Sequence, residues 1–156
     1  MTLGGRIIHP VCSKFIPHYL NNASWQHRVA GLSAIGLACE ACFEQYERQA
    51  DQIISTVLHF FKDSNARVRF SAVNSMALLI ENLKGMVKPN LTEQILQALL
   101  AILSDPIPRI VAHTARSMVN YFENADVKLV TKYADQTMQK LSALLGRPED
   151  FIQEHT

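Results

Sequence analysis

Ile54-Ser-Thr-Val-Leu-His-Phe-Phe-Lys-Asp63 and Leu96-Gln-Ala-Leu-Leu-Ala-Ile-Leu-Ser-Asp105 share their apolar positions and both close on an aspartate. They lie about 42 residues apart, and the same offset relates Asn74-Ser-Met-Ala-Leu-Leu-Ile-Glu-Asn82 to Arg116-Ser-Met-Val-Asn-Tyr-Phe-Glu-Asn124. A repeat of this length is one supersecondary unit that cannot bury its apolar face alone. The chain is therefore predicted to stack copies of one unit into an elongated array, whose concave surface binds other macromolecules.

Apolar residues inside each unit recur at helical spacing, as Ile53, Val57 and Phe60 do, and sustained alternation typical of strands is absent. Short polar corners, Asp63-Ser-Asn-Ala66 and Asp105-Pro-Ile-Pro108, separate the helices. The pattern predicts an all-α fold, with a bend or a shortened helix at Pro17. The expected helices cover residues 7–20, 25–43, 46–62, 66–83, 91–104, 108–122 and 127–145, followed by a remnant at 149–156.

Paired in order, these helices form a right-handed α-α superhelix of about three and a half repeats. The expected units are 3–44, 45–84, 90–124 and a partial unit at 127–156. A complete array needs polar capping repeats at its ends, and none is evident. We therefore expect this single array to be a fragment of a longer solenoid.

The composition narrows the class of partner. The chain has 156 residues, of which 48% are hydrophobic and 19% charged, and its formal net charge is +1. Such a balance argues against direct binding of nucleic acid or of an anionic membrane, both of which favour a basic excess. The apolar run at 98–103 is far too short to span a membrane. The three cysteines, Cys12, Cys39 and Cys42, suggest free thiols in a reducing compartment.

The corner between helices carries a recognisable spacing, because Asp63 is followed by Val68 and Arg69. This spacing resembles that of HEAT repeats. We expect the valine to pack between the paired helices, while aspartates and arginines line up along the stack and bridge neighbouring units. The predicted inter-repeat ladder consists of Arg28, Asp63, Arg69, Asp105 and Arg109, although Val111 stands where unit three should carry its arginine.

Five stretches resemble the middle of a receptor of the importin-β (karyopherin-β) superfamily, and most closely its karyopherin beta-three subtype. They are Leu3-Gly-Gly5, Trp25 to Gly36, Asp63 to Asn74, Arg109 to His113 and Asn120 to Glu123. The resemblance implies a superhelical nuclear import receptor that carries cargo and releases it on binding Ran. It also implies contacts with Phe-Gly nucleoporins, for which Phe60, Phe61, Phe70 and Phe122 are candidates if they are not core residues. A central piece would lack the amino-terminal repeats that make the main Ran contact, and the protein would work in cytoplasm and nucleus.

The second helix of each unit is expected to line the concave side. Stripes at helical spacing there give nine candidate cargo-facing residues: Ser33, Leu37, Glu40, Asn74, Leu78, Glu81, Arg116, Asn120 and Glu123. We hypothesise that the three glutamates form an acidic ladder for basic protein cargo, and that Asn74 and Asn120 hold an extended peptide by its backbone. The alternative is a solvated face that binds nothing.

Other features have structural and functional interpretations. Trp25 either stacks on a ligand or packs as a staple in its corner, and the staple is favoured. The arginines at the corners either bind phosphate or bridge neighbouring repeats, and bridging is favoured. His113 either titrates when a partner binds or packs with its hydrogen bonds satisfied, and packing is favoured.

No catalytic motif is present, and Cys39-Glu-Ala-Cys42 lies inside a predicted helix without the further ligands of a metal site. We predict no enzymatic activity, no cofactor and no metal. An enzyme acting through these thiols is the contrasting hypothesis. A HEAT scaffold of another assembly, such as a phosphatase scaffold or a chromosome-associated protein, is the alternative function.

Overall fold

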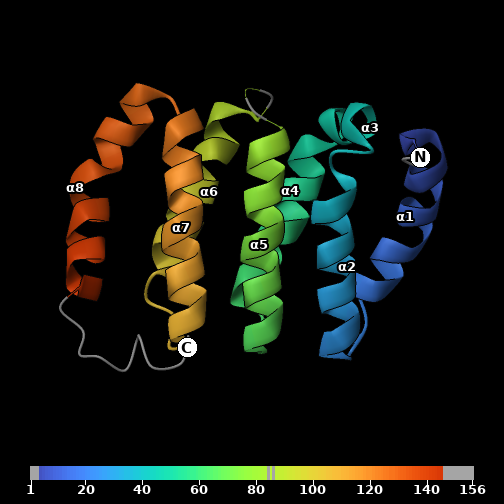
Figure 1. Ribbon diagram of the computed structural model, residues 1–156, viewed down its shortest axis with the longest axis horizontal. Helices are drawn as coiled ribbons and strands as arrows, with labels where there is room; N and C mark the ends of the chain where they lie inside the picture. The colour runs from blue at the N-terminus through green and yellow to red at the C-terminus, as the bar shows by residue number, and fades with distance from the viewer. Residues whose placement is uncertain (1–3, 84, 86, 146–156) are drawn as a thin grey trace.

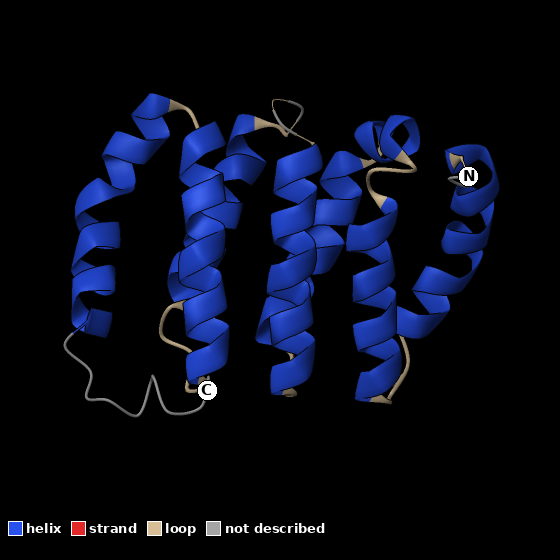
Figure 2. Ribbon diagram, viewed as in Figure 1, coloured by secondary structure: helices blue, strands red, loops and turns tan. Residues whose placement is uncertain are grey.

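The computed structural model describes residues 4–83, 85 and 87–145. Within these residues the regular structure is entirely helical (Figure 2), so the all-α prediction is confirmed. The elements are α1 (Gly5–Leu20), α2 (Trp25–Ala38), α3 (Phe43–Arg48), α4 (Ala50–His59), the 3-10 helix η1 (Phe60–Lys62), α5 (Ala66–Asn82), α6 (Pro89–Ile102), α7 (Pro108–Asn124) and α8 (Val127–Leu145).

The helices stack in solenoid fashion (Figure 1). Helices α2, α5 and α7 lie side by side in one layer, α4 and α6 lie behind them, and α1 and α8 stand at the two ends of the stack. Along the chain, α1 packs on α2, α4 on α5 and α6 on α7. Helix α5 also contacts both α2 and α7, so the successive pairs share one continuous apolar interior.

The buried stripe predicted for the middle unit is present on α5. Val68, Ala72, Met76, Leu79 and Leu83 are all fully buried. Their spacing places them on one side of the helix, where they meet the layer behind. The periodicity of the sequence therefore fixes which side of α5 is available to solvent.

Small residues let α2 and α5 approach closely. The Ser75 hydroxyl donates a buried hydrogen bond of 2.7 Å to the Leu32 carbonyl oxygen. A Cβ atom at Gly36 would lie 2.9 Å from Leu78 Cδ1 and 3.1 Å from Ser75 Cα. A larger residue at position 36 would therefore have to push the two helices apart.

Side chains and prolines start the second helices at the corners. Asp63 Oδ1 accepts a hydrogen bond of 2.8 Å from the Asn65 amide, and Asn65 Oδ1 accepts one of 2.9 Å from the Arg67 amide. The first turn of α7 instead begins with Pro108, whose missing N–H removes one orphan donor. These local signals explain why the predicted starts at residues 66 and 108 are correct.

The expected helices over 25–43 and 46–62 are wrong in their extents. Helix α2 ends at Ala38, a turn follows, and the separate helix α3 begins at Phe43. Cys39, Cys42 and Tyr46 stay in the core across this turn and are 0%, 0% and 4% exposed. A further break at Gln49 separates α3 from α4, and the chain closes that unit with the single 3-10 turn η1.

Pro17 does not shorten the first helix, because α1 continues through both Pro10 and Pro17 to Leu20 and curves along its length (Figure 1). The predicted remnant at 149–156 and Leu3 of the Leu3-Gly-Gly5 motif lie outside the described residues.

Substitutions at two leucines of α2 test whether this helix packs into the shared apolar interior. Leu32 is fully buried, whereas Leu37 is 73% exposed. Leu32→Ala should lower the free energy of unfolding by about 2–5 kcal/mol, since it removes buried methyl groups and leaves a cavity. The matched control Leu37→Ala should change it by less than about 0.5 kcal/mol. Urea denaturation followed by circular dichroism measures both, and equal losses would contradict the packing described here.

Candidate protein-binding surface

One side of the layer formed by α2, α5 and α7 is turned away from the buried stripes, and we call it the free face. On α5 the free face is marked by Asn74, Leu78 and Glu81, which are centred opposite the stripe that contains Ala72 at 100° per residue. Asn74 and Leu78 are half-buried and Glu81 is exposed.

The nine candidate cargo-facing residues all retain solvent exposure. Ser33, Asn74 and Leu78 are half-buried, and the other six are exposed: Leu37, Glu40, Glu81, Arg116, Asn120 and Glu123. The Ser33 hydroxyl lies 3.3 Å from the Ser71 hydroxyl, so this residue also joins α2 to α5. Glu40 lies in the turn just after α2 rather than inside the predicted helix.

The three glutamates stand at corresponding places, at or just beyond the carboxyl ends of α2, α5 and α7. Within the described part of the chain, Glu40, Glu81 and Glu123 form no ion pair. The helix dipoles also place partial negative charge at these ends. We call this set the glutamate row, and its charge favours a basic partner.

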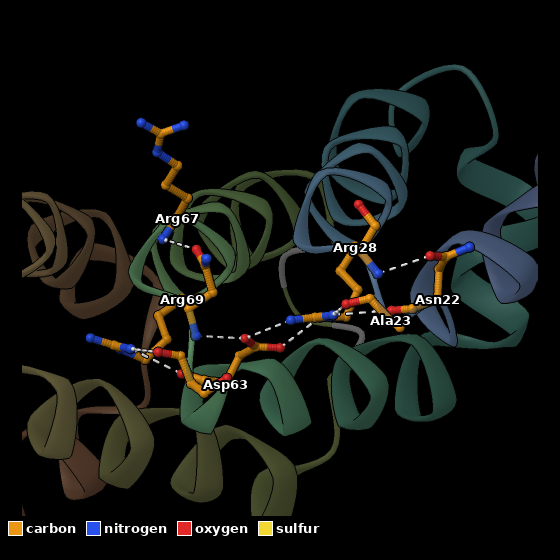
Figure 3. A network of polar contacts seen from close by, with 9 residues as sticks. Asn22, Ala23, Arg28, Asp63, Arg67 and Arg69 are labelled. Atoms are coloured by element: carbon orange, nitrogen blue, oxygen red, sulfur yellow. Dashed lines mark hydrogen bonds and ion pairs between the residues drawn. The ribbon is translucent and has the colours of Figure 1, made fainter.

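An ion-pair ladder joins the corners at the opposite ends of the same helices (Figure 3). Arg28 Nε donates to Asp63 Oδ2 at 2.8 Å, and Arg28 Nη2 donates to Asp63 Oδ1 at 3.1 Å. The remaining nitrogen, Nη1, donates to the carbonyl oxygens of Asn22 and Ala23 at 3.0 and 2.8 Å. The Arg28 side chain therefore binds the backbone of its own corner and the aspartate of the next corner.

The second rung repeats this geometry one unit later. Arg69 donates to Asp105 Oδ2 at 2.7 Å and to Oδ1 at 3.0 Å. Arg69 Nη1 also donates to the carbonyl oxygen of Asp63 at 2.9 Å, so the two rungs meet at Asp63. Asp63 and Asp105 are only 10% and 4% exposed at their side chains, so both pairs are largely shielded from solvent.

The electrostatics of the ladder appear in two pKa shifts. Burial raises the pKa of the Asp63 carboxyl, but hydrogen bonds from Arg28 and from the Asn65 amide outweigh burial and hold that pKa below its ordinary value. The hydrogen bond to Asp105 raises the pKa of the Arg69 guanidinium. Both shifts favour the charged forms that make the rungs.

Arg109 does not belong to the ladder, and this part of the prediction is wrong. Val111, which is fully buried, stands where the third rung would need an arginine. Arg109 aligns instead with Arg67, and each guanidinium lies over an aromatic ring. Arg67 Cζ is 4.8 Å from the centroid of the Trp25 ring, and Arg109 Cζ is 5.1 Å from that of Phe70.

His113 lies beside this second set of contacts. Its ring centroid is 4.7 Å from that of Phe70, and its Nε2 is buried without a hydrogen-bond partner among the described residues. The expectation of a fully satisfied histidine is therefore wrong. Burial lowers the pKa of His113, and the charges of Arg116 and Arg109 lower it further.

The Cys39–Cys42 pair lacks the environment of a reactive thiol. Burial raises the pKa of Cys39 to about 11, so the thiol stays protonated at neutral pH. Within the described ranges, no cluster of three or more His, Cys, Asp and Glu residues is arranged to hold a metal ion. Nor is any helix in the described part both long and apolar enough to cross a membrane.

A protein-family comparison matches residues 26–124 to the model described as the Vacuolar 14 Fab1-binding region. The match covers α2 to α7 and therefore includes the glutamate row and the ladder. HEAT-repeat scaffold families of this kind are typically non-enzymatic.

Solved structures of Kap121p, a karyopherin, match nearly the whole chain. Kap121p bound to RanGTP and Kap121p bound to Nup53p each share 24% identity with a TM-score of 0.88, over 97% of this chain and 15% of Kap121p. A Kap121p mutant with two aspartates and a glutamate changed to lysine shares 22% identity with a TM-score of 0.82, over 90% of this chain and 14% of the mutant. At this identity the likeness shows a common fold, and the chain spans about 15% of the length of Kap121p.

The ladder should make stability depend on pH through Asp63. Because the pKa of Asp63 is lowered in the folded state, its contribution is present above the unfolded pKa of about 3.9 and is lost as the pH falls through the folded pKa. Asp63→Asn should lower the free energy of unfolding by about 1.5–3 kcal/mol at pH 7, and this loss should shrink as the pH falls below the unfolded pKa of about 3.9.

Urea denaturation at pH 7 and pH 3 provides the measurement. The control is Asp51→Asn, which removes the exposed pair with Lys88 and should cost less than about 1 kcal/mol at pH 7. A pH-independent effect of Asp63→Asn would show that the charge of the rung contributes nothing.

Proposed function

Because the chain belongs to the family described as the Vacuolar 14 Fab1-binding region, we propose that it acts by binding proteins and catalyses no reaction. Within that class, we propose that it is the central cargo-binding section of a nuclear import receptor. The observation that carries this proposal is the glutamate row, three exposed acidic residues set one repeat apart at or just beyond the carboxyl ends of α2, α5 and α7.

Two comparisons support an import receptor over other arrays. The fold of nearly the whole chain matches Kap121p, which has been solved with RanGTP and with Nup53p. The Kap121p mutant replaces acidic residues by lysine at three positions that are themselves about one repeat apart. Acidic residues at that interval are the feature that the glutamate row shares with it.

The geometry suggests how a basic segment would bind. Neighbouring packed helices are about 8–10 Å apart, and an extended chain advances about 3.3 Å per residue. Lysines or arginines about three residues apart would therefore meet Glu40, Glu81 and Glu123 in turn. The side-chain amides of Asn74 and Asn120 lie along the same face and would bond the main chain of the segment.

The remaining partners follow from the same proposal. Ran would bind the full-length receptor, mainly outside this section, and its binding would release the cargo. Phe-Gly nucleoporins would be contacted during passage between cytoplasm and nucleus. Phe60 and Phe61 are 8% and 3% exposed, so both are core residues and neither offers a ready nucleoporin site.

The family match favours a second function, that of a scaffold in another assembly. The description of the family names Fab1 as the protein bound. In that case the free face, or α4 and α6 behind it, would hold an assembly partner permanently, and Ran would not release that partner.

Charge reversal of the glutamate row tests the cargo site. Glu40→Lys/Glu81→Lys/Glu123→Lys should weaken binding of a lysine-rich cargo peptide at least tenfold, because three exposed pairs of about 0–1 kcal/mol each are lost and replaced by repulsion. Fluorescence anisotropy of the labelled peptide measures the affinity.

The matched control changes the net charge of the chain by the same amount, at three acidic residues outside the glutamate row. Glu44→Lys/Glu47→Lys/Asp135→Lys alters exposed residues of α3 and α8, and it should leave the affinity within about twofold. Equal affinity of the row variant and the wild-type protein would refute the proposed cargo site.

The effect of RanGTP on a bound partner distinguishes the receptor function from the scaffold function. With the longer receptor immobilised and loaded with cargo, RanGTP should release most of the cargo, whereas RanGDP should not. Retention of the partner in the presence of RanGTP would favour the scaffold function instead.

A further inference from the structure

A second surface lies on the free face, nearer the amino ends of the helices. It is an open groove of about 460 Å³ that crosses α2, α5 and α7. Val29, Ile110 and Ser71 are among its lining residues, together with Trp25, Arg67, Phe70, Asn74 and Arg109. We call it the arginine–aromatic groove.

The two arginines of the groove are oriented but not neutralised. Each guanidinium lies over a ring of the preceding unit, Arg67 over Trp25 and Arg109 over Phe70. Neither forms an ion pair in the described portion of the chain, and both side chains belong to exposed residues. Stacking on a ring leaves the N–H edge of a guanidinium available for a bidentate carboxylate.

The surroundings of the groove are electropositive. Among the described residues that line the groove, none is acidic. The aspartates at the same ends of the helices, Asp63 and Asp105, are already bound by Arg28 and Arg69. The groove also lies at the amino-terminal halves of three helices, where the helix dipoles add partial positive charge. Exposed Arg116 extends this positive character along α7.

We propose that the arginine–aromatic groove binds an extended acidic segment of a protein. Its two arginines come from successive units, so carboxylates about three residues apart would reach both of them, by the same helix spacing and chain rise that apply to the glutamate row. Apolar side chains of the segment would cover the rings of Trp25 and Phe70. This inference does not depend on the proposed import function.

The groove and the glutamate row lie toward opposite ends of one face, with Asn74 between Arg67 and Glu81 on α5. Arg67 and Glu81 lie on the same side of α5, 14 residues apart, which corresponds to about 21 Å along the helix. An acidic segment is drawn to the amino ends of the helices and a basic segment to the carboxyl ends. The free face therefore selects both the position and the register of a partner that carries both kinds of segment.

The groove contains its own probe, because Trp25 is the only tryptophan of the chain. The experiment titrates the protein at low salt with a peptide without aromatic residues that carries glutamate at every third position, and follows the tryptophan emission. We expect a saturable change in emission that weakens steeply with added salt. The same peptide with lysine in place of glutamate should produce no saturable change.

Two variants assign the binding to the groove. Arg67→Gln/Arg109→Gln should weaken the acidic peptide at least tenfold, whereas the control Arg48→Gln, an exposed arginine on α3, should stay within twofold of wild type. Circular dichroism and thermal unfolding establish that both variants are folded. If the double variant melts early, Arg109→Gln alone serves, with an expected loss of at least threefold.

Three outcomes would overturn the inference. They are unchanged affinity in the folded arginine variants, equal binding of the lysine peptide, and tighter binding of a single-stranded RNA than of the acidic peptide. None of these outcomes bears on the glutamate row, whose test uses a basic peptide and different variants.

Discussion

Bidentate arginine–aspartate pairs join the corners of successive helix pairs in this chain. Arg28 and Arg69 each bind two carbonyl oxygens of their own corner and both carboxylate oxygens of the next aspartate. Such planar, fork-shaped contacts specify direction as well as distance. Together with the close packing of α2 on α5, the ladder holds the register in which the free faces of α2, α5 and α7 line up.

Because of this register, equivalent side chains of successive units lie next to one another and form continuous surfaces. One exposed glutamate or one stacked arginine binds little. Repeated once per unit, the glutamates form a row at one end of the helices, and the arginines form a groove at the other. The polarity of the helices reinforces both, because all three run in the same direction and their dipoles add. The same arrangement fits either proposed function, because a row and a groove that repeat along the array can each hold a segment of another protein.

Much of the fold could be predicted from the sequence because it is local and repeated. The offset of about 42 residues and the helical spacing identified most helices and the buried stripe of α5. The break after Ala38 is not evident from the sequence, because residues 39–42 contain no glycine or proline and the buried Cys39, Cys42 and Tyr46 keep the spacing of an unbroken helix. The stacking of Arg67 on Trp25 was also missed, because it joins residues of different units and depends on the register between them. The alignment of Arg67 with Arg109 was the signal that could have revealed it.

The ladder stops at the third corner, where Val111 takes the place of an arginine. Beyond it, in the part of the chain that the structure describes, α8 meets α6 through an exposed ion pair of Lys132 with Glu93. Tyr133 donates a hydrogen bond to Glu93 and accepts one from Gln97, and Leu129 and Tyr133 pack partly buried against the core. We therefore expect mechanical stiffness to be uneven along the molecule. The two largely shielded ion pairs should make the first two junctions resist torsion more than the last, whose ion pair is exposed, so the curvature of the array should adapt to an occupant mainly there.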